Sequence, residues 1–266
     1  MIYRSNIHTH TTFCDGADTP EDIVKSAMEK NMVSIGFSGH SVTEFDVSYC
    51  MKDENGYISE IRRLKEKYSG KIEIYLGIEQ DLYSLPPKPC YDYIIGSTHY
   101  VNVNGCMRDV DSSEEYMLET VEKFYGGDFY AYAEDYYKNV AEVGKKYKNC
   151  IIGHLDLLTK FNEGEKHFVY NSKYHDIAFG AIESLRGRIF EISTGAICRG
   201  VRTEPYPEKA LLKRIFETGG SIIITSDSHR KETLMFGFEQ AYALAKECGF
   251  KTCNVLKKDG ISDILI

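Results

Sequence analysis

Seven short apolar runs, each followed by a longer amphipathic stretch, constrain the fold of this 266-residue chain more than any other feature of its sequence. Few polar residues interrupt the runs, as expected for parallel strands that are covered on both faces. The predicted strands are residues 2–7, 33–37, 72–78, 91–96, 150–153, 188–192 and 221–225. Repeated strand–helix units favour one α/β domain with a closed or nearly closed parallel barrel, and an open doubly wound sheet is the alternative.

Helices are predicted between these strands. Thr19 and Pro20 provide an N-cap and a first helical position, and Glu21 and Asp22 place two acids in the first turn, which predicts a helix to about Lys30. The other predicted helices lie near residues 57–68, 113–124, 129–147, 173–185, 207–218 and 232–248. The glycine fingerprint of dinucleotide-binding folds is absent after the first strand, which weighs against the open sheet.

Side chains that can bind metals occur at or just past the C-terminal ends of six of the seven predicted strands. They are His8, His10, Asp15, His40, Glu79, His99, His154, Asp227 and His229. Parallel barrels place their active sites at this end of the strands. An ordinary core or loop role would explain each histidine alone, but six of the eight share this position, and only His167 and His175 lie elsewhere.

The donor types indicate which metals such a site would bind. Imidazoles mixed with carboxylates suit Zn, Mn or Fe, whereas Mg and Ca prefer oxygen ligands alone. The carboxylates of Glu79 and Asp227 supply negative charge, without which several closely spaced dications would repel one another strongly. The sequence therefore predicts two or three divalent transition-metal ions.

Six ordered motifs resemble those of the PHP (polymerase and histidinol phosphatase) family over nearly the whole chain. They are HTH at 8–10 with DG at 15–16, SGHS at 38–41, GIEQD at 77–81, GSTHY at 96–100, GHLD at 153–156 and SDSH at 226–229. The resemblance implies that residues 1–266 form one phosphoesterase domain, a distorted (β/α)7 TIM-like barrel with three metal ions. It implies one ion at His8, His10, Glu79 and Asp227, a second at Glu79, His99 and His154, and a third at Asp15, His40 and His229.

The chain is similar to the histidinol-phosphatase branch of that family in its length, its single-domain layout and its segment 193–207. The branch implies hydrolysis of the small phosphate ester L-histidinol phosphate in histidine biosynthesis. Two departures are expected to matter. Members commonly have Asp before the second-strand histidine, where this chain has Gly39, and the branch often has Arg shortly after the fifth-strand motif, where this chain has Thr159 and Lys160.

The predicted mechanism is in-line attack on phosphorus by a metal-bound hydroxide that is held by Glu79, His99 and Asp227. Arg199 is the first candidate for binding the phosphate, because a guanidinium group meets phosphate oxygens in a bidentate fork. Further candidates, for each of which a surface or structural role is the alternative, are Lys160, Arg202, Arg230 and Arg108. Asp156 is predicted to orient His154 or to cap the next segment.

The sequence is also compatible with other functions. The same machinery could act on another metabolite phosphate, a phosphotyrosine protein or an oligonucleotide. An amidohydrolase-type barrel that cleaves C–N bonds also begins with HxH, but it typically bridges its metals with a lysine on the fourth strand, where this chain has His99. A non-catalytic metal-binding protein is a further alternative.

Net charge, hydropathy and cysteine content limit the kinds of partner and the cellular compartment that are expected for this chain. The formal net charge of −8 weighs against long nucleic acids, which a negative surface repels. No apolar run approaches the ~20 residues of a membrane span. Eight scattered cysteines without a CxxC pair, and the absence of a leader-like start, predict a cytoplasmic protein with reduced thiols. The oligomeric state and the proton donor to the leaving group are not determined by the sequence.

Overall fold

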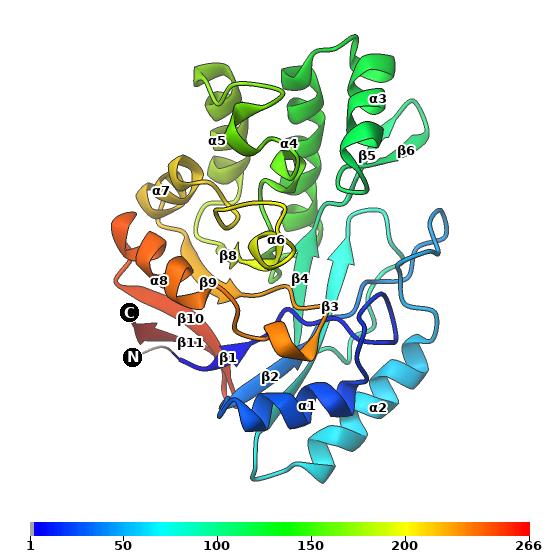
Figure 1. Cartoon of the computed structure of the whole chain (residues 1–266), viewed down its shortest axis with the longest axis vertical. Coiled ribbons are helices and arrows are strands. Elements are labelled where there is room, and N and C mark those ends of the chain that lie inside the picture. The colour runs from blue at the N-terminus through cyan, green and yellow to red at the C-terminus, as the bar shows by residue number, and fades with distance from the viewer. Residues whose placement is uncertain (1–2) are drawn as a thin grey trace.

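The computed structural model describes residues 3–266 and is built around one curled sheet of nine strands (Figure 1). The strand order is β1-β2-β3-β4-β7-β8-β9-β10-β11; every neighbouring pair from β1 to β10 is parallel, and β11 is antiparallel to β10. The strands of this sheet are β1 (Ser5–Asn6), β2 (Ser34–Phe37), β3 (Glu73–Asp81), β4 (Tyr93–Ser97), β7 (Ile151–Ile152), β8 (Ile189–Ser193), β9 (Ser221–Thr225), β10 (Thr252–Lys257) and β11 (Gly260–Leu265). The seven predicted strands correspond to β1, β2, β3, β4, β7, β8 and β9. Residue 2, where the first was predicted to begin, lies outside the described residues.

The ring of strands closes only beyond the ends of β1 and β9. The amide of His10 donates to the carbonyl of Ser228 at 2.8 Å, and the amide of Ser228 donates to the carbonyl of His8 at 3.0 Å. At its other end, β9 pairs with β10 through Asn254 and Ile223. The predicted distorted, seven-stranded TIM-like barrel is thus confirmed, with the β10–β11 hairpin added beside β9.

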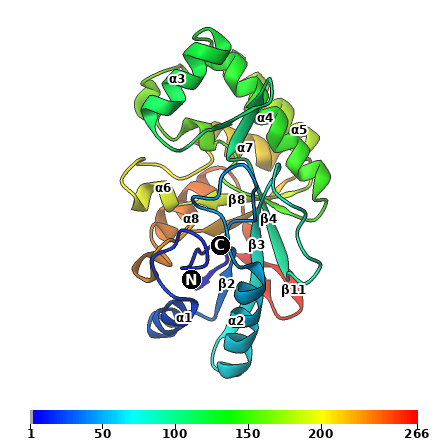
Figure 2. The ribbon, with the colours of Figure 1, turned by 90° about the vertical axis from the view of Figure 1, so that its right-hand side faces the viewer.

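Helices cover the outside of the sheet, and Figures 1 and 2 place α3, α4 and α5 at one end of the molecule and α1 and α2 at the other. The α-helices are α1 (Pro20–Glu29), α2 (Glu54–Lys67), α3 (Glu114–Tyr125), α4 (Phe129–Lys146), α5 (Ser172–Ser184), α6 (Gly195–Cys198), α7 (Lys209–Glu217) and α8 (Phe238–Glu247). Short 3-10 helices are η1 (Leu157–Thr159), η2 (Glu163–Glu165) and η3 (Lys231–Thr233). As predicted, the Thr19 side chain caps α1 by accepting from the amide of Asp22.

The structure corrects the sequence prediction in three places. The predicted helix 232–248 is divided into η3 and α8, because Gly237 between them has a φ of 72°, a left-handed conformation that interrupts a helix. An antiparallel hairpin, β5 (Tyr100–Val103) with β6 (Cys106–Asp109), follows β4 and was not predicted. The β10–β11 hairpin at the C-terminal end was not predicted either.

A cluster of buried side chains from the strands fills the space beneath the strand ends, and Tyr93 lies within it. The Tyr93 hydroxyl donates to the carbonyls of Ile7, at 2.5 Å, and Phe37, at 3.1 Å. Gly36 and Gly77 leave room for Tyr93, because a Cβ atom would collide with its hydroxyl at Gly36 and with its ring at Gly77. Tyr93 thereby links β4 to β1 and β2 beneath the rim where the predicted ligands gather.

No helix in residues 3–266 is long and apolar enough to cross a membrane.

Candidate metal centre

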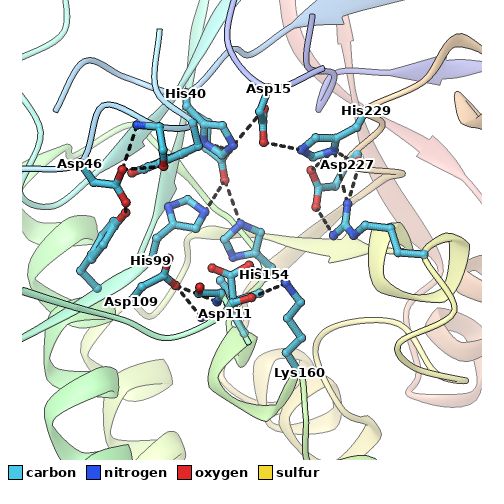
Figure 3. Close-up of a pocket in the computed structure, with 17 residues that line it drawn as sticks. Asp15, His40, Asp46, His99, Asp109, Asp111, His154, Lys160, Asp227 and His229 are labelled. Carbon is cyan, nitrogen blue, oxygen red and sulfur yellow. Dashed lines mark hydrogen bonds and ion pairs between the residues drawn. The ribbon is translucent and has the colours of Figure 1, made fainter. Parts of the chain in front are cut away.

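The nine predicted ligand side chains meet at the C-terminal rim of the barrel. Their donor atoms form overlapping groups in which all atoms lie within 4.8 Å of one another. The groups are His10, Asp15, His40 and His229; His8, His10 and Asp227; His8, Glu79 and His154; and His40, Glu79 and His99. In Figure 3, the rings of His40, His99, His154 and His229 point toward a common space. The grouping overlaps with the three predicted ligand sets without being identical to them, so the division among ions stays a prediction.

Glu79, at the end of β3, is the centre of this arrangement. Its side chain is 1% exposed, and its oxygens lie 2.8 Å from His40 Nδ1 and His154 Nε2 and 3.3 Å from His8 Nε2 and His99 Nε2. Burial alone would raise the pKa of Glu79, but the surrounding imidazoles, His8 and His40 first, hold it well below its usual value. His10 Nε2 lies 3.5 Å from the same carboxylate, so Glu79 is an ionised group shared by five imidazoles, which is the arrangement that a bridging anion requires.

Several donor atoms at this centre are buried and have no hydrogen-bond partner within residues 3–266. They include His8 Nε2 and His10 Nε2, which face the carboxylates of Glu79 and Asp227. A buried polar atom without a partner costs about 1–3 kcal/mol, so these two nitrogens indicate a site built for a cation. The mixed imidazole and carboxylate set fits divalent transition metals, and the residues present are therefore compatible with a multinuclear site.

Asp15 and His229 form the more open side of the cluster. Asp15 Oδ2 lies 3.2 Å from His229 Nε2, and the ring of His229 stacks on His10 with centroids 4.1 Å apart. Burial, together with the charges of His229 and His40, lowers the pKa of His10 to about 3. His10 is thus neutral at physiological pH, the form in which an imidazole can bind a metal.

Asp227 connects the cluster to Arg199. Asp227 Oδ1 lies 3.2 Å from His10 Nε2, while Oδ2 accepts a hydrogen bond from Arg199 Nη2 at 2.9 Å. Burial would raise the pKa of Asp227, but Arg199 and then His8 hold it well below its ordinary value. Arg199 follows the short helix α6 and lines the cavity that opens over the cluster.

That cavity has a volume of about 310 Å³ and two chemically different ends. The inner end is formed by Glu79, the clustered histidines and Asp227. The outer wall is formed by Asp46, Ser48 and Tyr49 of the loop after β2, by Tyr100 and Asp109 of the β5–β6 hairpin, and by Asp111, Ser112 and Lys160. Its carboxylates and tyrosines were not identified from the sequence.

Two carboxylates of the outer wall differ in charge state. Burial and then the neighbouring Asp111 raise the pKa of Asp109 to about 7. Burial would also raise the pKa of Asp111, but Lys160 lowers it to about 2. Lys160 Nζ donates to the carboxylate of Asp111 at 2.9 Å and to its carbonyl at 2.6 Å, as Figure 3 shows in part.

Three other predicted phosphate-binding candidates lie outside the lining of the cavity. Arg202 is 6% exposed, donates to the carbonyl of Thr159 at 3.1 Å and stacks on Tyr206. Arg230 is exposed and precedes η3, and Arg108 donates to Thr120 Oγ1 at 3.0 Å. These contacts favour structural roles. Neither predicted role of Asp156 is seen. Its side chain makes no capping hydrogen bond to η1, the next segment, and His154 Nδ1 has no hydrogen-bond partner within residues 3–266. The Asp156 carboxylate instead accepts from the amide of Glu208, before α7, at 2.9 Å.

Gly39, one of the two expected departures from the family pattern, is closely surrounded. A Cβ atom at this position would lie 3.0 Å from Met51 Cε and 3.4 Å from Cys14 Sγ. Cys14 Sγ itself lies 3.6 Å from His10 Nδ1. A larger side chain at position 39 would therefore require Met51 to move, and Cys14 contacts the back of His10.

Sequence analysis missed two buried carboxylates that touch the predicted ligands. Glu191 of β8 lies 2.6 Å from His8 Nδ1, and Asp81 of β3 accepts from the backbone amide of His99 at 2.9 Å. Glu191 is fully buried. Its signal in the sequence is a single charge inside an otherwise apolar strand, because a buried carboxylate is found almost only where it has a partner.

Comparisons with known proteins agree with this geometry. The family model described as "PHP domain" matches residues 6–195. A "probable histidinol-phosphatase" of Deinococcus radiodurans is 27% identical over 258 residues, which cover 92% of this chain and 94% of that protein. The histidinol-phosphatase of Bacillus subtilis is 26% identical over 263 residues, covering 87% of this chain and 96% of the relative.

Among solved structures, the histidinol phosphate phosphatase of Lactococcus lactis subsp. lactis, in complex with Zn, L-histidinol and phosphate, has the same fold. Its TM-score is 0.73 at 21% sequence identity, and the match covers 98% of this chain and 99% of the other.

Proposed function

Because the chain belongs to the PHP domain family, and because its clustered imidazoles and carboxylates are those of a metal-dependent phosphoesterase, we propose that it hydrolyses L-histidinol phosphate to L-histidinol and inorganic phosphate. The observation that carries this choice is the division of one cavity into a metal-binding end and an acidic, tyrosine-lined end. L-Histidinol phosphate has a matching division, with an anionic phosphate at one end and an amine and an imidazole at the other. The names of the relatives, at 24–27% identity over most of their length, support the same substrate.

The inner end of the cavity would hold two or three divalent ions, of Zn, Mn or Fe. Their ligands would be His8, His10, Asp15, His40, Glu79, His99, His154, Asp227 and His229. Bound divalent ions supply acidification of a water molecule and charge compensation on the phosphoryl oxygens.

Arg199 is the side chain best placed to bind the phosphate. It lines the cavity. Its Nη2 donates to the Asp227 carboxylate at 2.9 Å, and its Nη1 lies 3.3 Å from the Asp227 carbonyl and 3.4 Å from His229 Nδ1, so phosphoryl oxygens would bind the remaining N–H groups of the guanidinium. Burial would lower the pKa of Arg199, but Asp227 raises it, so the group carries its charge at every physiological pH. Lys160 adds a second positive charge from the outer wall, where Asp111 holds it.

Asp46 and Asp109 are proposed to bind the cationic end of the leaving group. Both line the cavity, and neither forms an ion pair with a basic side chain among residues 3–266, whereas Asp111 is paired with Lys160. Asp46 is held in place by the hydroxyl of Tyr100 at 2.8 Å. Two carboxyl groups without a basic partner beside a phosphate site favour an ester whose alcohol carries positive charge, because a bound cation would favour the ionised form of Asp109, whose pKa is about 7 without it.

The test compares phosphate release from L-histidinol phosphate, glycerol 3-phosphate, phosphotyrosine and an oligonucleotide, with metal content measured in the same sample. We expect kcat/KM to be highest for L-histidinol phosphate. Asp109→Asn should lower it about tenfold to a hundredfold for that substrate, the size of a lost charge-assisted hydrogen bond, and leave glycerol 3-phosphate almost unchanged. Asp259→Asn, in an exposed turn, is the matched control. Equal rates on all monoesters in a metal-loaded sample would contradict the proposed substrate.

A further inference from the structure

Of the seven barrel strands, β8 alone contributes no donor to the clustered groups, yet its central residue touches them. Glu191 lies in the middle of β8 and is 0% exposed. A fully buried carboxylate is costly unless its oxygens are well satisfied by hydrogen bonds. The contacts of Glu191 therefore indicate what this residue is for.

Both oxygens of Glu191 are engaged by neighbouring strands. Oε1 lies 2.6 Å from His8 Nδ1 and accepts from Thr225 Oγ1 at 2.7 Å. Oε2 accepts from the backbone amide of His154 at 2.7 Å. One carboxylate thus joins the ends of β1, β7 and β9, and its oxygens are used by the protein rather than directed at the centre of the cluster.

The contact between Glu191 and His8 determines which nitrogen of the His8 ring can bind a metal. A carboxylate at Nδ1 keeps the proton on Nδ1, so the lone pair of the neutral ring lies on Nε2. His8 Nε2 faces inward, 3.3 Å from Glu79 Oε2 and 3.6 Å from Asp227 Oδ1, and has no hydrogen-bond partner within residues 3–266. With the opposite tautomer, Nε2 would carry a proton and could not bind a metal.

The other two contacts extend this control to further ligands. Holding the amide of His154 fixes the backbone from which that ring projects, and Thr225 lies two residues before Asp227 on the same segment. His8, His154 and Asp227 are members of the two donor groups that share His8. Glu191 therefore contacts a ligand, or a residue next to a ligand, in both of these donor groups.

We propose that Glu191 is a positioning residue of the metal centre, which fixes the tautomer of His8 and aligns the ends of β7 and β9 so that both groups sharing His8 can bind their ions. The inference rests on the metal site of the proposed function but not on the identity of its substrate. A protein that binds its metals and yet releases no phosphate from L-histidinol phosphate would refute the substrate and leave the role of Glu191 open to its own test.

Two substitutions separate this role from simple packing. Glu191→Gln keeps the shape of the side chain but replaces one acceptor by an amide donor. That donor must face either the amide of His154, where two donors would meet, or His8, where it favours the wrong tautomer. Glu191→Asp keeps two acceptors but shortens the side chain and leaves a gap. If Glu191 mattered only for packing, Gln would be the milder change; if it acts as an acceptor, Asp is the milder change.

The measurement is metal binding, made on protein whose folding is verified by circular dichroism. Metal per chain is determined by mass spectrometry, affinity by competition with a chelating indicator, and ligand geometry by the visible spectrum of the Co²⁺-substituted protein. We expect Glu191→Gln to bind at least one ion about tenfold to a hundredfold more weakly than wild type, with an altered Co²⁺ spectrum and with Glu191→Asp between the two. Asp156→Asn, which removes another fully buried carboxylate whose hydrogen bond is to the amide of Glu208, should bind metal as wild type does.

Wild-type affinity and spectrum in Glu191→Gln would overturn the proposal, and so would weaker binding by Glu191→Asp than by Glu191→Gln. If Glu191→Gln does not fold, Glu191→Asp decides alone. Affinity reduced about tenfold, with an altered Co²⁺ spectrum and a wild-type free energy of unfolding for the metal-free protein, would then support the positioning role. Unchanged affinity, or a loss of affinity that is accompanied by an equal loss of stability, would refute it.

Discussion

At the scale of single residues, the conformation of Asp227 is determined by the two contacts that its carboxylate makes. One of its oxygens faces His10 and the other binds Arg199, and its backbone has a φ of 43°, a region that residues other than glycine seldom adopt. Asp is among the residues that tolerate this region best. Strain of this kind, of order 1–3 kcal/mol, is characteristic of functional sites, where surrounding contacts impose it.

Arg199 allows a direct test of phosphate binding. Arg199→Ala should raise KM for L-histidinol phosphate about tenfold to a hundredfold, the value of a charge-assisted hydrogen-bond pair, with a smaller change in kcat. Steady-state kinetics on metal-loaded protein provides the measurement, and Arg186→Ala, in an exposed surface pair with Glu183, serves as control. If kcat and KM were unchanged in Arg199→Ala, Arg199 would not bind the phosphate of the substrate.

The residue scale also shows where sequence reasoning succeeds and where it stops. The histidines were predictable because they follow strand ends, and parallel strand ends meet at one rim. Arg199 was the first candidate from the sequence and Arg202 a further one, but only the folded chain shows that Arg202 packs against Thr159 while Arg199 lines the cavity. Glu191 lies inside its strand rather than after it, so a search of strand ends passes over it.

At the scale of elements, the barrel strands could be predicted and the hairpins could not. The barrel strands are continuous apolar runs because both of their faces are buried. By contrast, β6 has no buried residue and β11 alternates between exposed and half-buried positions, so neither has a strong apolar pattern. The outer wall of the cavity, to which β5 and β6 contribute, was missed for this reason.

Packing between β3 and β4 depends on the absence of a side chain at Gly77. Gly77→Ala would press a methyl group into the ring of Tyr93 and should lower stability by about 1–3 kcal/mol, as overpacking does. Gly180→Ala, in α5, meets no atom within 4 Å and should raise stability by about 0.4–1 kcal/mol. Denaturant unfolding of both variants checks the opposite signs; equal effects would show that Tyr93 can move aside.

The start of α7 should make stability depend on pH. Burial, and then Asp156, raise the pKa of Glu208 from 4.5 to about 8. The folded state therefore holds a proton that the unfolded state releases, and this group's contribution to stability is lost as pH rises from about 4.5 to 8. Burial lowers the pKa of its partner His175, 2.9 Å away, so the titration of His175 acts in the opposite direction, and a comparison with a variant that changes Glu208 alone removes it.

Glu208→Gln lacks this titration. The difference in melting temperature between the variant and wild type should therefore shift in favour of the variant as the pH is raised from 5 to 8.5. Calorimetry at several pH values provides the check, and a difference that stays constant, or shifts in favour of wild type, would show that Glu208 is ionised throughout.

At the scale of the whole molecule, the predicted ligands come from six strands and lie across the seam between β1 and β9. Ions that bind only the folded chain stabilise it by about 2.7 kcal/mol when free metal is at a hundred times its Kd. Removing them with a chelator should therefore lower the melting temperature by several degrees, and adding Zn or Mn should restore it. Identical melting curves for demonstrably metal-free and metal-loaded protein would mean that the cluster binds ions too weakly to support the ring.

The two ends of the cavity come from different parts of the architecture. Ligands sit at the ends of barrel strands, where a shift would disturb the ring, whereas Asp46, Tyr49, Tyr100 and Asp109 sit on a loop and a hairpin inserted after β2 and β4. Substitutions in the loop and the hairpin, which we propose to contact the alcohol of the substrate, should therefore change substrate preference while metal binding is retained.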